Sequence, residues 1–226
     1  MLIADELLLL ALDDDTGKLI ASGTTLDAAM GGALVVELVL AERISIAPAE
    51  AGWLEKGKIT VINTNPTDDP DLDALLAKLT AKDGQKVKNL ISPMTWKPIS
   101  HKLRQRRLAR LVQQGVLTED SGGFWGIKRH PTRDRAPEQE VRARVWSALV
   151  DGLTPTERTV ALIALLEATG IVTKVVVTED KKTVRRRAKE LAEGDWAAKA
   201  VKDAIAEMMT VVAVTASAGA AGGGSS

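Results

Sequence analysis

The fold is decided by the run LDAAMGGALVVELVL at residues 26–40. Its apolar side chains recur at helical spacing, with Thr25 or Asp27 as the expected N-cap, so the run predicts one mostly buried helix. Gly31 and Gly32 lie inside it, where each glycine costs on the order of 1 kcal/mol relative to alanine. This cost predicts that the helix packs closely against another backbone, with the other elements arranged around it.

The segments on either side of this run predict a second helix and a small sheet. Residues 3–12 form an apolar stretch that ends at Asp13–Asp15, which is typical of a buried helix stopped by polar turn residues. Alternating apolar residues at Ile44–Ile46 and Lys58–Ile62 predict two short strands around a turn-rich segment. We expect this sheet to cap the first two helices.

The rest of the chain carries further helical patterns, whose ends are marked by capping residues and prolines. We expect helices at Leu72–Thr80, Val87–Ile91, within residues 96–117, and at Glu138–Val150, Thr156–Thr169, Val184–Glu193 and Trp196–Val214. Residues 216–226 contain only Ala, Gly and Ser and predict a flexible tail after a single domain of residues 1–215.

The composition of the 226 residues excludes several classes of protein. Hydrophobic residues make up 45% of the chain, which is enough for the core of one compact domain. The absence of cysteine excludes disulfides, thiolate metal sites and cysteine nucleophiles. Nucleotide-binding and hydrolase motifs are absent, and the aspartates at 13–15 do not have the ligand spacing of a calcium loop. We therefore expect no enzyme, no metal site and no cofactor.

The start of the chain and its apolar runs bear on its location. The first residues are acidic, where a secretory signal would be basic. No apolar run reaches the roughly 18–20 residues that a membrane span needs. We expect a cytoplasmic protein.

The charges sum to zero but are unevenly distributed. Residues 1–80 carry five Lys/Arg and fourteen Asp/Glu, whereas residues 96–144 carry twelve and five. In the basic zone Arg104, Arg107 and Arg110 recur at i, i+3 and i+6 and share one side of a helix. Such a helix predicts contact with the phosphates of an anionic membrane or of nucleic acid.

A β-hairpin is expected at about residues 116–128, directly after the basic helix. Alternating apolar residues flank a turn at Asp120–Gly123. The alternation places Trp125 and Ile127 on one side of the hairpin and Phe124 on the other, so a single core cannot bury both sides. At least one aromatic side chain is expected to face a partner or a lipid interface.

Three interpretations of the basic helix and the hairpin remain open. The first is docking on an anionic membrane. The second is a winged helix that binds nucleic acid, although the hairpin tip carries aromatic residues in place of cations and the preceding 80 residues are acidic. The third is an oligomeric scaffold that uses the hairpin for assembly. An alternative to all three is that the arginines form ion pairs with the acidic first third of the chain.

Five segments occur in a specific order and spacing: ADELLLLALDD at 4–14, GGALVVELVLAERI at 31–44, Trp96-Lys-Pro98, LVQQGVL at 111–117 and His130-Pro131. Together they resemble the Golgi phosphoprotein 3 family, whose bacterial members are numerous in actinobacteria. The resemblance spans Leu2 to about Val214. On this basis the chain is identified as a bacterial, actinobacterial-type member of the family.

The resemblance implies a mainly α-helical bundle with a projecting hydrophobic hairpin that supports oligomerisation and membrane contact. In eukaryotic relatives a basic pocket binds the head group of phosphatidylinositol 4-phosphate, and the protein links the membrane to the cytosolic tails of glycosyltransferases. A Trp and an Arg of that pocket align here with Ser22 and Gly31. Two further Arg align with Arg104 and Arg107, or equally well with His101 and Arg104.

The sequence thus predicts a mainly α, single helical-bundle domain with a small β element and a projecting β-hairpin. We expect a cytoplasmic, peripheral membrane adaptor that binds an anionic, phosphoinositide-like head group. The residues expected to contact lipid lie on the basic helix and the hairpin: His101, Arg104, Arg106, Arg107, Arg110, Phe124, Trp125 and Ile127. The expected partners are an anionic phospholipid surface, protein cargo and a second copy of the chain bound through the hairpin. Nucleic acid is not expected.

Overall fold

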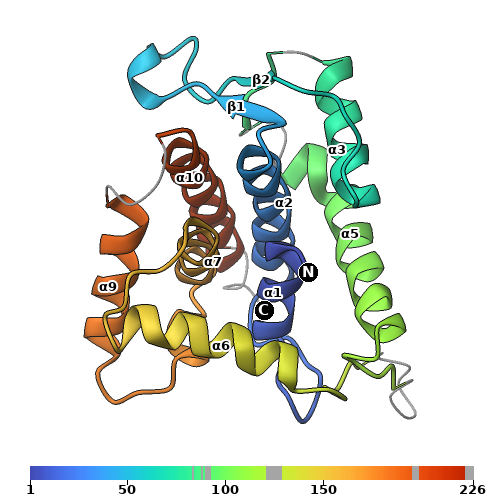
Figure 1. Ribbon diagram of the computed structural model, residues 1–226, viewed down its shortest axis with the longest axis vertical. Helices are drawn as coiled ribbons and strands as arrows, with labels where there is room; N and C mark the ends of the chain where they lie inside the picture. The colour runs from blue at the N-terminus through green and yellow to red at the C-terminus, as the bar shows by residue number, and fades with distance from the viewer. Residues whose placement is uncertain (83, 88, 90–92, 121–128, 195–198, 222–226) are drawn as a thin grey trace.

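The structure is a computed structural model that describes all residues except 83, 88, 90–92, 121–128, 195–198 and 222–226 (Figure 1). The side chains of residues 49, 93–101, 199–200 and 216–221 also fall outside the description. The elements are, in chain order, α1 (Ile3–Leu10), α2 (Gly23–Leu40), β1 (Ile44–Ile46), the 3₁₀ turn η1 (Ala49–Ala51), β2 (Ile59–Val61), α3 (Pro70–Ala81), α5 (Pro93–Gln113), α6 (Ala136–Leu149), α7 (Glu157–Ala168), α8 (Val172–Val175), α9 (Lys181–Glu193) and α10 (Lys199–Ala221). The predicted mainly α fold with a small two-stranded sheet is confirmed.

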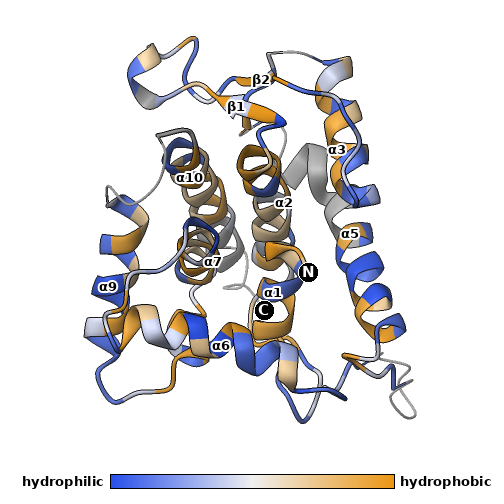
Figure 2. Cartoon of the chain, in the orientation of Figure 1, coloured by the Kyte–Doolittle hydropathy of each residue, from blue (hydrophilic) through white to orange (hydrophobic). Residues whose placement is uncertain are grey.

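Helix α2 lies in the middle of the bundle and packs against α1, α5, α7 and α10 (Figure 1). Hydrophobic residues follow most of its length (Figure 2). Among the described residues, α2 is the helix that is long and apolar enough to cross a membrane. This finding corrects the expectation that no run is that long. In the bundle 78% of this apolar window is buried, because neighbouring helices cover it.

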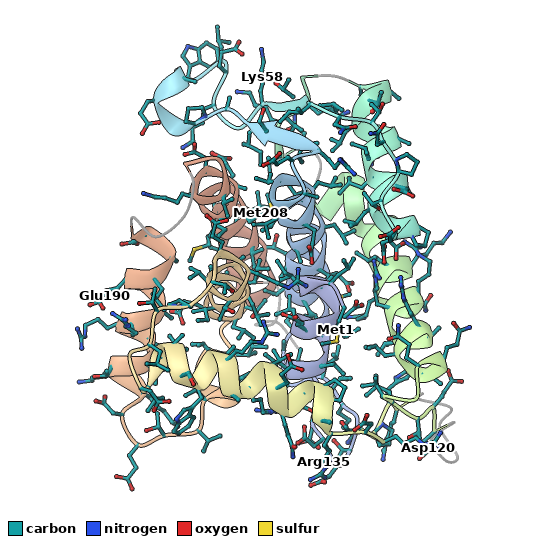
Figure 3. All side chains as sticks on the ribbon, viewed as in Figure 1. Met1, Lys58, Asp120, Arg135, Glu190 and Met208 are labelled. Carbon is teal, nitrogen blue, oxygen red and sulfur yellow. The ribbon has the colours of Figure 1, made fainter. Side chains whose placement is uncertain are left out.

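Gly32, the second glycine of the pair in α2, allows α10 to approach closely. A Cβ atom added to Gly32 would lie 2.7 Å from Sδ of Met208, the α10 residue labelled in Figure 3. The expected partner was another backbone, whereas the structure places a methionine side chain there. The unbranched thioether of methionine adapts to the shallow site that the missing Cβ leaves.

The small sheet is confirmed as an antiparallel pair of β1 and β2. Ile44 pairs with Val61 and Ile46 with Ile59. Ile44, Ile46 and Ile59 are buried, and β1 contacts both α2 and α10. The sheet therefore closes one end of the bundle, as Figure 1 shows at the top.

The start of α2 differs from the expectation. The helix begins at Gly23, and its N-cap is Ser22, whose side chain makes no capping hydrogen bond. Neither Thr25 nor Asp27 is the cap, because both lie inside the helix. The Asp27 carboxylate instead forms an ion pair with Arg104 of α5.

The carboxyl-terminal helix is longer than expected. Helix α10 runs to Ala221, past the predicted start of the tail at residue 216. Alanine has the highest helix propensity, so an alanine-rich stretch continues a helix that is already packed. Residues 222–226 lie outside the described part of the chain.

The described base of the predicted hairpin is present. Leu117 pairs with Thr132, and Asp120 exchanges two 2.9 Å backbone hydrogen bonds with Arg129. The described part of the return arm is Arg129–Thr132, and the expected return residues 124–128 lie outside the described residues. Phe124, Trp125 and Ile127 fall in the segment that the structure does not describe.

The return arm packs against the loop between α1 and α2 at Gly17. Gly17 has a φ of +61°, and a Cβ there would lie 2.5 Å from backbone atoms of His130. Only glycine combines this left-handed conformation with so close an approach. Gly17 thereby fixes the position of the segment that leaves the hairpin.

Replacing Gly17→Ala is expected to lower the free energy of unfolding by about 2–5 kcal/mol. The left-handed conformation costs about 1–2 kcal/mol, and forcing the His130 backbone aside costs about 1–3 kcal/mol more. Gly84→Ala is the matched control, because Gly84 has a φ of +73° but open space around its Cβ position. Urea unfolding of both variants measures the difference, and equal losses would contradict this role of Gly17.

Candidate functional site

Arg107 lies at the centre of a buried ion-pair network rather than on an exposed face. Its side chain is 1% exposed. Its guanidinium donates hydrogen bonds to both carboxylate oxygens of Asp69, and its Nε lies 3.1 Å from Asp71. Nη1 of Arg107 also lies 3.7 Å from Oδ1 of Asp5. The expectation that Arg107 faces solvent is wrong, because these three carboxylates hold it between α1, α3 and α5.

Asp69 joins this network to the start of α3. As the N-cap residue it accepts the backbone N–H groups of Asp71 and Leu72, and it also accepts hydrogen bonds from Arg107 and Arg110. Burial alone would raise the pKa of Asp69, but the hydrogen bond and the charge of Arg107 outweigh burial and hold that pKa below its usual value. Asp69 therefore stays ionised in the folded protein.

Asp5 is the weakly satisfied member of the network. Its Oδ2 accepts the Leu2 N–H at 2.9 Å, whereas its buried Oδ1 has no hydrogen-bond donor among the described residues. Burial raises the pKa of Asp5, and the nearby charge of Arg107 only partly offsets this effect. The pKa of Asp5 is therefore shifted upward, whereas that of Asp69 is shifted downward.

The other arginines of α5 are also paired with acidic residues. Arg106 contacts Asp71, and its side chain is 51% exposed; Arg110 contacts Asp69 and is 40% exposed. Arg104 is 15% exposed, lies 3.2 Å from Asp27 and donates to the carbonyl oxygen of Gly23. The interpretation that the arginines pair with the acidic first third is confirmed, and the predicted continuous cationic face is absent from the described part of α5.

Four of the residues expected to contact lipid cannot be placed. His101 belongs to α5, but its side chain is among those that the structure does not describe. Phe124, Trp125 and Ile127 are likewise outside the described residues. Their roles remain predictions.

A small hollow lies beside Arg106, between α2, α3 and α5. It has a volume of about 190 Å³, and Leu34, Leu75 and Leu103 form its apolar wall. Lys78 and Arg106 also line it, together with one carboxylate, that of Asp71, which pairs with Arg106. We call it the α3–α5 hollow. Two cations against one carboxylate leave the hollow with a net positive charge beside its apolar wall, which is complementary to an anionic amphiphile.

A second ion network, which the sequence did not reveal, fixes α1. Glu37 of α2 accepts the Ile3 backbone N–H at 2.6 Å and a hydrogen bond from Arg158. Arg144 and Arg158 both contact Glu6. The residues of each pair are 34 or more positions apart in the chain, so no local pattern could indicate the pairing.

The described residues contain no group of three or more His, Cys, Asp or Glu side chains that could hold a metal ion. Asp5, Asp69 and Asp71 lie close together around Arg107. The guanidinium lies between these carboxylates, and its hydrogen bonds use both oxygens of Asp69.

Comparison with known proteins shows the family of this chain. The family model described as Golgi phosphoprotein 3 (GPP34) matches residues 3–208. The chain belongs to the Golgi phosphoprotein 3 family. It is 28% identical over 205 residues to the vacuolar protein sorting-associated protein 74 of Eremothecium gossypii. That match covers 79% of this chain and 62% of the relative, so it spans less than two thirds of the relative's length.

The structure also separates the two arginines that were aligned with the head-group pocket of the Golgi phosphoprotein 3 family. Arg104 lies against Gly23, next to Ser22, the position that aligns with the Trp of the pocket. Arg107 points instead into the network with Asp69. The alignment with Arg104 and Arg107 includes a buried arginine, Arg107. The alternative alignment, with His101 and Arg104, does not.

Removal of a charge from the network is expected to destabilise the protein strongly. Arg107→Met removes the cation that three buried carboxylates share and leaves Asp5 without an ion-pair partner, so it should lower the free energy of unfolding by about 3–5 kcal/mol. Arg106→Ala breaks a half-exposed pair and should cost less than about 1 kcal/mol. Urea unfolding measures both values. Similar losses in the two variants would show that the contribution of Arg107 to the free energy of unfolding does not depend on its burial.

The lowered pKa of Asp69 makes part of the stability pH-dependent. Between the lowered folded value and the ordinary value of 3.8, the unfolded state binds more protons. The contribution of Asp69 is therefore complete above the ordinary value and is lost as the pH falls through the folded value. Asp5 has the opposite effect on stability, because its protonation at low pH removes the cost of burying a charged carboxylate.

Thermal unfolding from about pH 5 to about pH 2 tests this assignment. The melting temperature of the unmodified protein should fall more steeply than that of Asp69→Asn, which keeps an N-cap residue but has no charge to titrate. Asp5→Asn should not flatten the curve. Parallel curves for the unmodified protein and Asp69→Asn would contradict the assignment.

Proposed function

We propose that this protein is a non-enzymatic peripheral adaptor in membrane trafficking that docks on anionic phospholipid. Its membership of the Golgi phosphoprotein 3 family, over residues 3–208, supports the proposal. The similarity to a fungal protein named for vacuolar protein sorting supports a role in trafficking. We place the protein in the cytoplasm with peripheral membrane association, and we retain the bacterial, actinobacterial type as part of the proposal.

The α3–α5 hollow is the observation that carries lipid binding. Leu34, Leu75 and Leu103 offer an apolar wall of the kind that an acyl chain contacts, while Lys78 and Arg106 supply cations for a phosphate. Arg106 uses its Nε and Nη2 on Asp71, and its side chain remains half exposed. Its guanidinium therefore still has donors to offer to a head group.

The remaining lipid contacts are proposed for the rest of α5 and for the hairpin segment. Arg110 is 40% exposed next to the Arg107 network, and His101 and Arg104 are one of the two pairs that the sequence resemblance aligns with the family's pocket. Phe124, Trp125 and Ile127 would insert at the interface. Arg107 is excluded from this set because it is buried.

The proposed lipid specificity is for general anionic phospholipid rather than for one phosphoinositide. Ser22 and Gly31 stand where the resemblance places a Trp and an Arg, and Asp27 already pairs with Arg104. A head group would have to compete with this carboxylate. Protein cargo and a second copy bound through the hairpin remain proposed partners of the domain at residues 1–215.

Co-sedimentation with phosphatidylcholine vesicles, with and without phosphatidylserine, tests the proposal. The protein should bind the anionic vesicles, and Lys78→Ala with Arg106→Ala should weaken binding. Each cation near an anionic bilayer contributes about 1 kcal/mol, so the pair corresponds to a loss of roughly 10- to 30-fold.

The matched control removes two cations from α9, by Arg185→Ala with Lys189→Ala. This variant has the same net charge as the test variant and should bind the anionic vesicles like the unmodified protein. Equal binding to neutral and anionic vesicles, or an equal loss in both double variants, would sink the proposal. Vesicles with phosphatidylinositol 4-phosphate test the finer specificity and should bind no more tightly than vesicles of equal charge.

A further inference from the structure

Helix α9 carries a cationic surface, although residues 145–226 as a whole have no net charge. Its thirteen residues include six Lys/Arg and two Glu. Val184, Ala188 and Leu191 are buried against the bundle, so the helix has one apolar face. The cations cover the outer side, where Figure 2 shows hydrophilic residues alternating with the hydrophobic ones.

Two of these six cations form ion pairs among the described residues, and Lys182 also interacts with the nearby charge of Asp180. Arg186 and Arg187 both contact Glu190, at 3.0 and 4.0 Å. The ion pairs of the described part of the chain include none for the other four cations of the helix: Lys181, Lys182, Arg185 and Lys189. Helix α5 differs in this respect, because Arg104, Arg106, Arg107 and Arg110 are each paired with an aspartate.

A hollow lies between this cationic face and the end of α7. It has a volume of about 440 Å³ and is lined by Arg185, Arg186, Lys189, Glu167 and Gly170. No atom lies within 4 Å of the Cβ position of Gly170, so the backbone is open on that side. Three cations and one carboxylate line this hollow, and its charge is therefore positive.

Helix α9 and helix α5 lie at opposite edges of the bundle. Figure 1 shows α9 at the left edge and α5 at the right, and Figure 3 labels Glu190 of α9 at the left edge. A membrane docked against the exposed side of α5 would leave the outer side of α9 facing the solution. An adaptor needs such a second surface for the partner that it links to the membrane.

We propose that the outer face of α9, with the hollow formed by Arg185, Arg186 and Lys189, binds an acidic segment of a protein partner. The positive charge is complementary to Asp and Glu side chains, and arginine forms bidentate hydrogen bonds with carboxylates. The hollow is a concave site in which an acidic side chain of a peptide can lie between several cations. The proposal rests on the proposed function only for the orientation of α9 away from the membrane.

Fluorescence anisotropy with a labelled oligo-glutamate peptide tests the proposal on the full chain. The unmodified protein should bind the peptide saturably, and added salt should weaken binding because exposed charges are screened. Arg185→Ala with Lys189→Ala should weaken the affinity by about tenfold. Lys78→Ala with Arg106→Ala, the variant that removes two cations near α5, should change it by less than about twofold.

The same two variants on phosphatidylserine vesicles and on duplex DNA separate the alternative partners. Peptide affinity that is equal in both variants overturns the proposal. Loss of vesicle binding in the α9 variant would make α9 a membrane surface, and α9-dependent binding of DNA tighter than of the peptide would make it a nucleic-acid surface; either result overturns the proposal too. Absence of all vesicle binding, with peptide binding that depends on α9, would refute the proposed function alone.

Discussion

The buried ion pair of Arg107 and Asp69 is the constraint on which the arrangement of α1, α3 and α5 depends. A guanidinium that is 1% exposed requires charged partners, since an unpaired buried charge costs several kcal/mol. Asp69 meets this need while it caps α3, and Asp71 and Asp5 complete the surroundings of the guanidinium. The three helices therefore cannot move independently of one another, and the described arginines of α5 are each paired with an aspartate.

This neutralisation changes how a membrane adaptor of the Golgi phosphoprotein 3 family would use its charges. The basic zone of the sequence does not form a free cationic face, so docking through α5 depends on the half-exposed Arg106 and Arg110 and on the apolar wall of the α3–α5 hollow. Lys181, Arg185 and Lys189, for which the described residues provide no ion pair, lie on α9, at the other edge of the bundle. The two surfaces suit two different partners.

Much of the fold could be predicted because its signals are local. The apolar spacing of α1, α2, α6 and α9 and the alternation of β1 and β2 depend on neighbouring residues, and these elements are present as expected. Helix ends were less predictable. Asp27 has the chemistry of an N-cap but pairs with Arg104, and the alanines after residue 216 continue α10 because a packed helix precedes them. The return arm of the hairpin at Arg129–Thr132 depends on Gly17, which is more than 100 residues away in the chain.

The sequence by itself determined which faces are apolar and how many charges each segment carries, because both follow from the order of the residues. Only the tertiary structure decided which charges remain available. Arg107 meets Asp69 across 38 residues, and Arg104 meets the start of α2 across 81, so helix packing selects these pairs and no spacing rule can. For the same reason residues 145–226 sum to zero charge in the sequence, yet in the folded chain α9 presents a positive surface.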